Sequence, residues 1–107
     1  MRVLIDESLP VEVADELPGF DVATVHAQHW LRLRNGVLLR AALAAGFGVI
    51  LTADSDLRYQ QNLPKIGIAA VVLVGVRNRI EDLRPLISHS VDALRKVEPG
   101  KVIEITG

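Results

Sequence analysis

The chain has 107 residues, enough for one domain, and half of them are hydrophobic, so it can bury a core rather than remain disordered. Its formal net charge of −1 gives no overall attraction to nucleic acid or anionic membranes, so such contacts would need a local basic patch. No cysteine is present, which excludes disulfides, thiolate metal sites and cysteine nucleophiles. Neither a signal peptide nor an apolar run near the ~20 residues of a membrane span is visible, so we expect a cytoplasmic protein without membrane contact.

Apolar residues dominate four segments that we expect to be strands: 2–5, 20–25, 48–52 and 68–76. In the first of them they are consecutive, as is typical of a strand covered on both faces. Helical spacing marks three segments between them and a long segment after Asn78: 8–17, 35–45 and 55–63. A final segment, 101–105, alternates polar and apolar residues as a half-exposed edge strand does.

This alternation of strands and helices predicts one domain over 1–107, a three-layer α/β/α sandwich around a mostly parallel five-stranded sheet. We expect the strand order 2-1-3-4-5, counted along the sequence. The first and third strands then lie side by side at the point where the strand order reverses.

Prolines, capping residues and apolar spacing give the expected details of the helices. Pro64 is expected to end the third helix, and Pro85 to break or kink the last, because proline lacks the N–H that a helix interior needs. Asn78 and Glu81 have the spacing of a capping box at the start of the last helix. The second helix is expected to bury one stripe: Val37, Leu38, Ala41, Ala42 and Ala45.

Acidic residues directly follow the first and third strands. Asp6 follows the run Val-Leu-Ile, and Asp54 and Asp56 lie in Thr-Ala-Asp-Ser-Asp after the third strand. In open parallel sheets, ligands bind beyond the carboxyl ends of the strands where the order reverses. Carboxylates held close together repel unless a cation lies between them, and hard oxygen ligands suit Mg²⁺ or Mn²⁺. These aspartates are candidate metal ligands and catalytic residues, although each one alone could equally cap a helix.

Other polar residues could support such a site. Thr52 could hold a carboxylate or a metal-bound water, or simply close a strand as a β-branched residue. Glu7 is a weaker candidate because residues next to one another on a strand point to opposite faces. Six polar residues are candidates for nucleic-acid contacts: Arg34, Arg58, Tyr59, Gln60, Gln61 and Asn62. Alternatively, they only form a solvent-exposed helix and surface.

Two histidines and the tryptophan lie between the second strand and the second helix. His26 and His29 have a spacing that could bind zinc, but no third or fourth ligand is obvious, and we favour packing of the loop. Trp30 is expected to anchor the core or an interface.

Four stretches carry a resemblance that covers most of the chain: VLIDESLP (3–10), WLRLRNGVLL (30–39), TADSDLRYQQNL (52–63) and NRIEDLRPL (78–86). In this order they resemble the small PIN-like proteins of bacteria, which are regarded as toxins of VapBC-like toxin–antitoxin modules. The resemblance implies a PIN-like fold and a Mg²⁺- or Mn²⁺-dependent ribonuclease, with RNA as substrate and a cognate antitoxin as partner. It matches Asp6 and Asp54 to the family's metal-binding acids. Such toxins are commonly dimers, and the last helix and edge strand carry apolar residues for a two-fold interface.

The second helix departs from this family pattern. Relatives usually carry a glutamate where this chain has Val37, and Asp56 stands where asparagine is common, so Asp56 could partly replace the missing carboxylate. Losing one ligand predicts a weaker metal site. Two hypotheses follow, a toxin endoribonuclease and a catalytically degenerate PIN-like module that acts through a protein partner.

A phosphoacceptor receiver domain is a third possibility, since acids follow the first strand and an aspartate follows the third. The chain lacks the Ser or Thr that should end the fourth strand and the lysine that should follow the fifth. We therefore rank this alternative below the other two.

Overall fold

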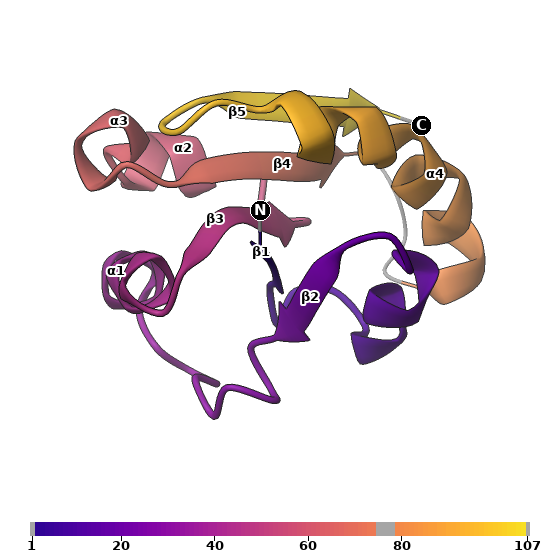
Figure 1. The fold of residues 1–107 in the computed structure, drawn as a ribbon, viewed down its shortest axis with the longest axis horizontal. Coiled ribbons are helices and arrows are strands. Elements are labelled where there is room, and N and C mark those ends of the chain that lie inside the picture. The colour runs from indigo at the N-terminus through magenta and orange to yellow at the C-terminus, as the bar shows by residue number, and fades with distance from the viewer. Residues whose placement is uncertain (1, 75–78, 107) are drawn as a thin grey trace.

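The strands form a five-stranded sheet in which each neighbouring pair is parallel (Figure 1). The computed structural model describes residues 2–74 and 79–106. Within these ranges the strands are β1 (Arg2–Ile5), β2 (Asp21–Thr24), β3 (Phe47–Thr52), β4 (Ala69–Val74) and β5 (Val102–Thr106). Their order is β2-β1-β3-β4-β5, which confirms the predicted arrangement with β1 and β3 adjacent.

Helices cover both faces of the sheet, which is the middle of three layers (Figure 1). The 3-10 helix η1 (Val11–Glu16) and the long helix α4 (Ile80–Lys96) pack on one face. The helices α1 (Asn35–Ala44), α2 (Leu57–Gln60) and α3 (Leu63–Ile66) pack on the other. The predicted three-layer α/β/α sandwich is therefore confirmed.

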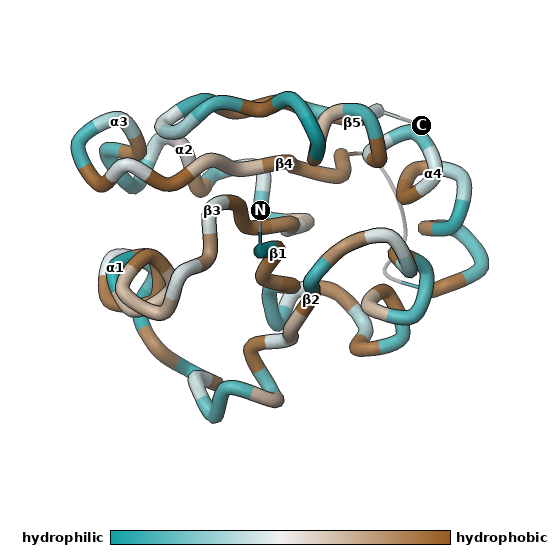
Figure 2. The backbone as a smooth tube through the Cα atoms, viewed as in Figure 1, coloured by the Kyte–Doolittle hydropathy of each residue, from teal (hydrophilic) through white to brown (hydrophobic). Residues whose placement is uncertain are grey.

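Successive side chains of the strands enter two separate cores. Val3 and Ile5 of β1 belong to the core under η1 and α4, whereas Leu4 belongs to the core under α1, α2 and α3. All three are buried, which explains why the strand sequences lack polar alternation. Figure 2 shows the same concentration of hydrophobic residues along β4.

An ion pair joins the two elements on the η1 and α4 face. The Arg84 Nε donates to the Glu16 Oε1 at 2.9 Å. The hydrogen bond and the charge of this carboxylate raise the pKa of the Arg84 guanidinium above its ordinary value. The pair ties η1 to the first half of α4 at the surface.

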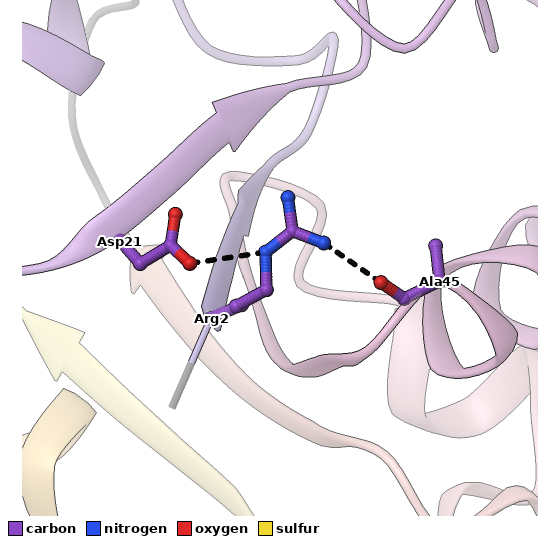
Figure 3. Close-up of polar contacts among 3 residues, drawn as sticks. All are labelled: Arg2, Asp21 and Ala45. Carbon is purple, nitrogen blue, oxygen red and sulfur yellow. Dashed lines mark hydrogen bonds and ion pairs between the residues drawn. The ribbon is translucent and has the colours of Figure 1, made fainter.

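The amino edge of the sheet, where the strands begin, is held by Arg2 (Figure 3). Its Nε lies 3.2 Å from the Asp21 Oδ2 at the start of β2. Its Nη1 donates to the Ala45 carbonyl oxygen at 2.7 Å, just after α1 ends. Its guanidinium carbon also lies 4.1 Å from the centre of the Phe47 ring. One side chain thus joins three elements with charge-assisted contacts.

The segment between β3 and β4 differs from the single helix predicted over 55–63. It contains two short helices, because α2 ends at Gln60 and Asn62 caps α3 by accepting the Lys65 N–H at 3.2 Å. Pro64 lies in the first turn of α3 rather than ending the preceding helix. Its missing N–H costs nothing there, since first-turn N–H groups have no partner within the helix.

The last helix runs through Pro85 without the predicted break. Pro85 is exposed, and the neighbouring residues Leu83 and Leu86 are buried in the core, so packing keeps the helix continuous across the lost hydrogen bond. Asn78 lies outside the described residues, and Arg79 is the residue before the first helical turn, without a side-chain cap. The first predicted helix is a 3-10 helix instead of an α-helix.

The buried face of α1 is also different from the predicted stripe. Leu38, Leu39 and Ala42 are buried, whereas Val37 is 54% exposed. Because Leu39 completes the buried face, Val37 in the first turn points away from the core. Gly46 follows α1 in the left-handed conformation expected of a helix C-terminus.

Candidate active site

The carboxyl edge of the sheet, where the strands end, brings the predicted acids of β1 and β3 to neighbouring positions. Ile5 pairs with Leu51, and the Asp6 N–H donates to the Leu51 carbonyl at 3.0 Å, which extends the ladder one residue beyond β1. Asp6 therefore lies beside the last residue of β3, Thr52. This is the arrangement that the strand order required.

The Asp6 carboxylate accepts two hydroxyl hydrogen bonds on the same oxygen. The Thr52 Oγ1 donates to Asp6 Oδ2 at 2.8 Å, and the Ser8 Oγ donates to it at 2.7 Å. Thr52 is fully buried, so its hydroxyl needs this partner. The role predicted for Thr52, that of holding a carboxylate, matches these contacts.

Both hydroxyls also accept backbone N–H groups from the loop after β3. Ser8 Oγ accepts the Ala53 N–H at 3.1 Å, and Thr52 Oγ1 accepts the Asp54 N–H at 3.0 Å. The loop after β1 and the loop after β3 are thus joined by one hydrogen-bonded group, Asp6, Ser8, Thr52 and the two amides. Hydroxyls that donate to a carboxylate while they accept amides fix the direction of the whole group.

Asp54 and Asp56 form the turn that leads into α2. Asp54 Oδ1 accepts the Asp56 N–H at 3.0 Å, and the Asp54 carbonyl accepts the Leu57 N–H at 3.3 Å. Asp56 is exposed and directly precedes α2, without a side-chain cap bond of its own. Asp54 therefore shapes the turn whatever else it does, as the alternative interpretation of each acid proposed.

The described residues supply few open carboxylate oxygens for a metal. Within residues 2–74 and 79–106, no three His, Cys, Asp or Glu side chains form a group that could hold a metal ion. In the same ranges no hydrogen bond reaches Asp6 Oδ1 or Asp54 Oδ2. Mg²⁺ keeps several waters and is often bound through only one or two carboxylates plus substrate phosphates. The described residues therefore form no all-protein cage, and a Mg²⁺ or Mn²⁺ ion at this edge would need water and substrate phosphates to complete its ligands.

Glu7 is exposed and holds the loop after β2. Its Oε1 accepts the backbone N–H of Arg32 at 3.3 Å. Arg32 and His29 both have positive φ angles, 67° and 61°, that non-glycine residues rarely adopt. The loop after β2 is therefore strained at two residues and hydrogen-bonded to the loop after β1, and such strain often accompanies functional sites.

Within the same loop, Trp30 packs inward while the histidines lie at the surface. The Trp30 ring meets the Phe47 ring edge to face, with centroids 6.0 Å apart. Trp30 thus anchors the loop in the core, as expected. His26 and His29 are exposed.

The predicted nucleic-acid contacts have mixed positions. Tyr59 is 73% exposed, and Arg34 is exposed just before α1. Gln60 Oε1 accepts from the Asn35 side chain at 3.2 Å, and a Cβ on Gly36 would lie 3.0 Å from Gln61 Oε1, so these glutamines face the start of α1. Of the remaining two predicted residues, Asn62 caps α3, and the Arg58 side chain lies outside the described part of the structure.

Sequence reasoning missed Ser8 as a member of the site. The Asp-x-Ser spacing at 6–8 was a usable signal, because aspartate side chains often form local hydrogen bonds with the residue two positions on. The second half of its contacts, to Ala53, depends on the pairing of β1 with β3 and has no signature in the local sequence.

A surface hollow of about 280 Å³ lies at the amino edge, away from the acids. It is lined by Gly19, Phe20, Asp21, Leu94 and Arg95. The guanidinium of Arg95 lies 5.6 Å from the Phe20 ring centre. This hollow and the carboxylates therefore lie at opposite edges of the sheet, and the candidate site is the edge that carries the carboxylates.

Comparisons with protein-family models, with curated proteins and with solved structures found no significant match to this chain. No helix in the described ranges has both the length and the apolar character needed to cross a bilayer.

Proposed function

We propose that this protein is a metal-dependent endoribonuclease of the PIN-like type, the toxin of a VapBC-like toxin–antitoxin module in the cytoplasm. The observation that carries the proposal is Asp6, held by two hydroxyls at the end of β1, beside the loop that bears Asp54. It supports the resemblance of the four sequence stretches because the matching residues meet at one edge of the sheet.

In this proposal the acids would bind a metal ion, and other exposed residues would contact RNA. Asp6 and Asp54 would hold a Mg²⁺ or Mn²⁺ ion, with Asp56 as an additional carboxylate nearby. When bound, the ion supplies charge neutralisation for the phosphodiester and lowers the pKa of an attacking water. Tyr59 offers an exposed ring for a base, and Arg34 an exposed cation for a phosphate.

Protein partners form the second part of the proposal. A cognate antitoxin would cover the acidic carboxyl edge and block RNA. A homodimer also remains a proposal. Leu83 and Leu86 of α4 are buried in the core of the same chain, whereas Ile103 and Ile105 of β5 are only partly buried against it.

A second candidate function is a PIN-like binding module without catalysis. Two observations favour it, the absence of a three-ligand group in the described ranges and the exposed valine at position 37. In this case the acidic edge would bind a protein partner and no divalent ion.

Calorimetric titration with Mn²⁺ separates the two candidates, and Asp54→Asn is the decisive variant. An asparagine oxygen can still accept the Asp56 N–H, so the turn survives while the charge is lost. We expect saturable binding by the native chain, loss of binding in Asp54→Asn, and no change in Asp92→Asn, which alters an exposed acid of α4. RNA cleavage by the native chain alone would then complete the case, and no Mn²⁺ binding at millimolar concentration would leave the binding module.

Val37→Glu tests the cause of a weak site. The side chain is exposed on the first turn of α1, so a carboxylate is accommodated without loss of packing. If this position belongs to the metal site, the added ligand raises Mn²⁺ affinity by about tenfold, or ~1.4 kcal/mol. A control, Leu43→Glu, places a carboxylate on another exposed position of α1 and leaves affinity unchanged. Equal affinity in native chain and Val37→Glu would show that residue 37 lies outside the site.

A further inference from the structure

Ser8 lies in the loop after β1 and contacts two loops at once. Its hydroxyl donates to Asp6 Oδ2 at 2.7 Å and accepts the Ala53 N–H at 3.1 Å. It also lies 3.2 Å from the Thr52 hydroxyl, which donates to the same carboxylate oxygen. The Ala53 N–H, in the loop after β3, therefore fixes the direction of the Ser8 hydroxyl, which donates to the Asp6 carboxylate in the loop after β1.

We propose that Ser8 is a positioning residue that turns the Asp6 carboxylate so that its Oδ1 faces the ligand. The inference rests on the proposed function, because it assigns Ser8 a part in the same site. Two donors on Oδ2 fix the rotation of the carboxylate about its Cβ–Cγ bond. Oδ1, which receives no hydrogen bond from the described residues, is the oxygen left for a cation.

The alternative role of Ser8 is to stabilise the turn and no more. The two roles differ in what the lost hydroxyl changes. A turn residue affects the free energy of unfolding, whereas loss of an outer hydrogen bond to a metal ligand typically weakens metal affinity by about 10–100-fold. Thr52 alone would still hold Oδ2, so the fold at Asp6 is expected to survive the loss of Ser8.

The test compares Mn²⁺ affinity in the native chain and four variants by calorimetry, with thermal unfolding measured on each. Ser8→Ala removes the hydroxyl, and Ser8→Thr keeps it. Ser8→Cys keeps the shape but offers a weak donor, and it replaces Ser8→Ala if that variant does not fold. Ser88→Ala is the matched control, because Ser88 is exposed on α4.

We expect Ser8→Ala and Ser8→Cys to bind Mn²⁺ about 10–100-fold more weakly, with Ser8→Thr close to the native affinity. If Ser8→Ala binds as the native chain does, or if Ser8→Thr is as weak as Ser8→Ala, the positioning role is wrong while the metal site stands. If the native chain binds no Mn²⁺, the proposed function fails first and the positioning role fails with it. The two failures are thus distinguishable in one set of titrations.

Discussion

The two edges of the sheet differ in how their charged residues are held. At the amino edge, Arg2 pairs with Asp21, caps the carbonyl end of α1 and covers the Phe47 ring (Figure 3). At the carboxyl edge, the Asp6 carboxylate accepts hydrogen bonds from two hydroxyls, and no ion pair with it is found within residues 2–74 and 79–106. Opposite charges pair at the first edge, whereas two hydroxyl groups hold the Asp6 carboxylate at the second.

Backbone conformation follows the same division. Left-handed residues at the amino edge, before β3, β4 and β5, are glycines, namely Gly46, Gly67 and Gly100. Those in the loop at the carboxyl edge are His29 and Arg32, whose side chains make this conformation costly. Gly100 also lies so close to α3 that a Cβ would approach the Pro64 Cα to 2.8 Å.

The contacts and glycines of the amino edge therefore favour stability, whereas the left-handed His29 and Arg32 at the carboxyl edge reduce it. Natural sequences agree with local structural preferences except at sites that function requires. The strained backbone at His29 and Arg32 therefore favours the carboxyl edge as the candidate site, independently of any sequence resemblance. Three substitutions test this division.

Thr52→Val should have the largest effect. It removes a fully buried hydroxyl that donates to Asp6 and accepts the Asp54 N–H, at almost constant volume. We expect the free energy of unfolding in urea to fall by about 2 kcal/mol, because buried polar partners lose their hydrogen bonds. Thr52→Ser retains the hydroxyl and should lose much less. Equal losses in both variants would show that the methyl group matters and the hydrogen bonds do not.

The strands and their order could be predicted because sheet burial leaves a simple sequence pattern. Residues 3–5 are all apolar since both faces of β1 are covered, and the crossover rule then limits the order of parallel strands. Asp6 and Asp54 could be placed at one edge by the same argument. Helix boundaries were harder, because Asn62 and Pro64 start a new helix through local capping that the apolar spacing does not reveal.

The details of the site could not be predicted, since they depend on contacts between loops. The link from Ser8 to Ala53 spans 45 residues and exists only once β1 lies beside β3. The strain at Arg32 has no signature either, because the sequence offers an ordinary arginine where a glycine would be expected. Sequence thus located the edge, and the packed structure determined which atoms face one another there.

Arg2→Ala should have the next largest effect, at the amino edge. The side chain is 37% exposed and its partner Asp21 68% exposed, so solvent screens the ion pair and most of the loss comes from the Ala45 carbonyl and the Phe47 ring. We expect a loss of about 1 kcal/mol in urea unfolding, with Mn²⁺ affinity unchanged. Arg2→Lys keeps the charge but not the planar fork, and should recover only part of the loss. A change in Mn²⁺ affinity would contradict the separation of the two edges.

Arg32→Gly should have the smallest effect, and the opposite sign. Glycine adopts a φ of 67° freely, so the substitution relieves strain, although it also adds freedom to the unfolded chain. We expect the free energy of unfolding to rise by about 0.5 kcal/mol. Arg34→Gly is the matched control, because Arg34 is also an exposed arginine but has an ordinary φ of −64°. This control substitution should lower the free energy of unfolding. If both variants lose stability equally, Arg32 is not strained, and the loop at the carboxyl edge follows the same backbone rules as the turns at the amino edge.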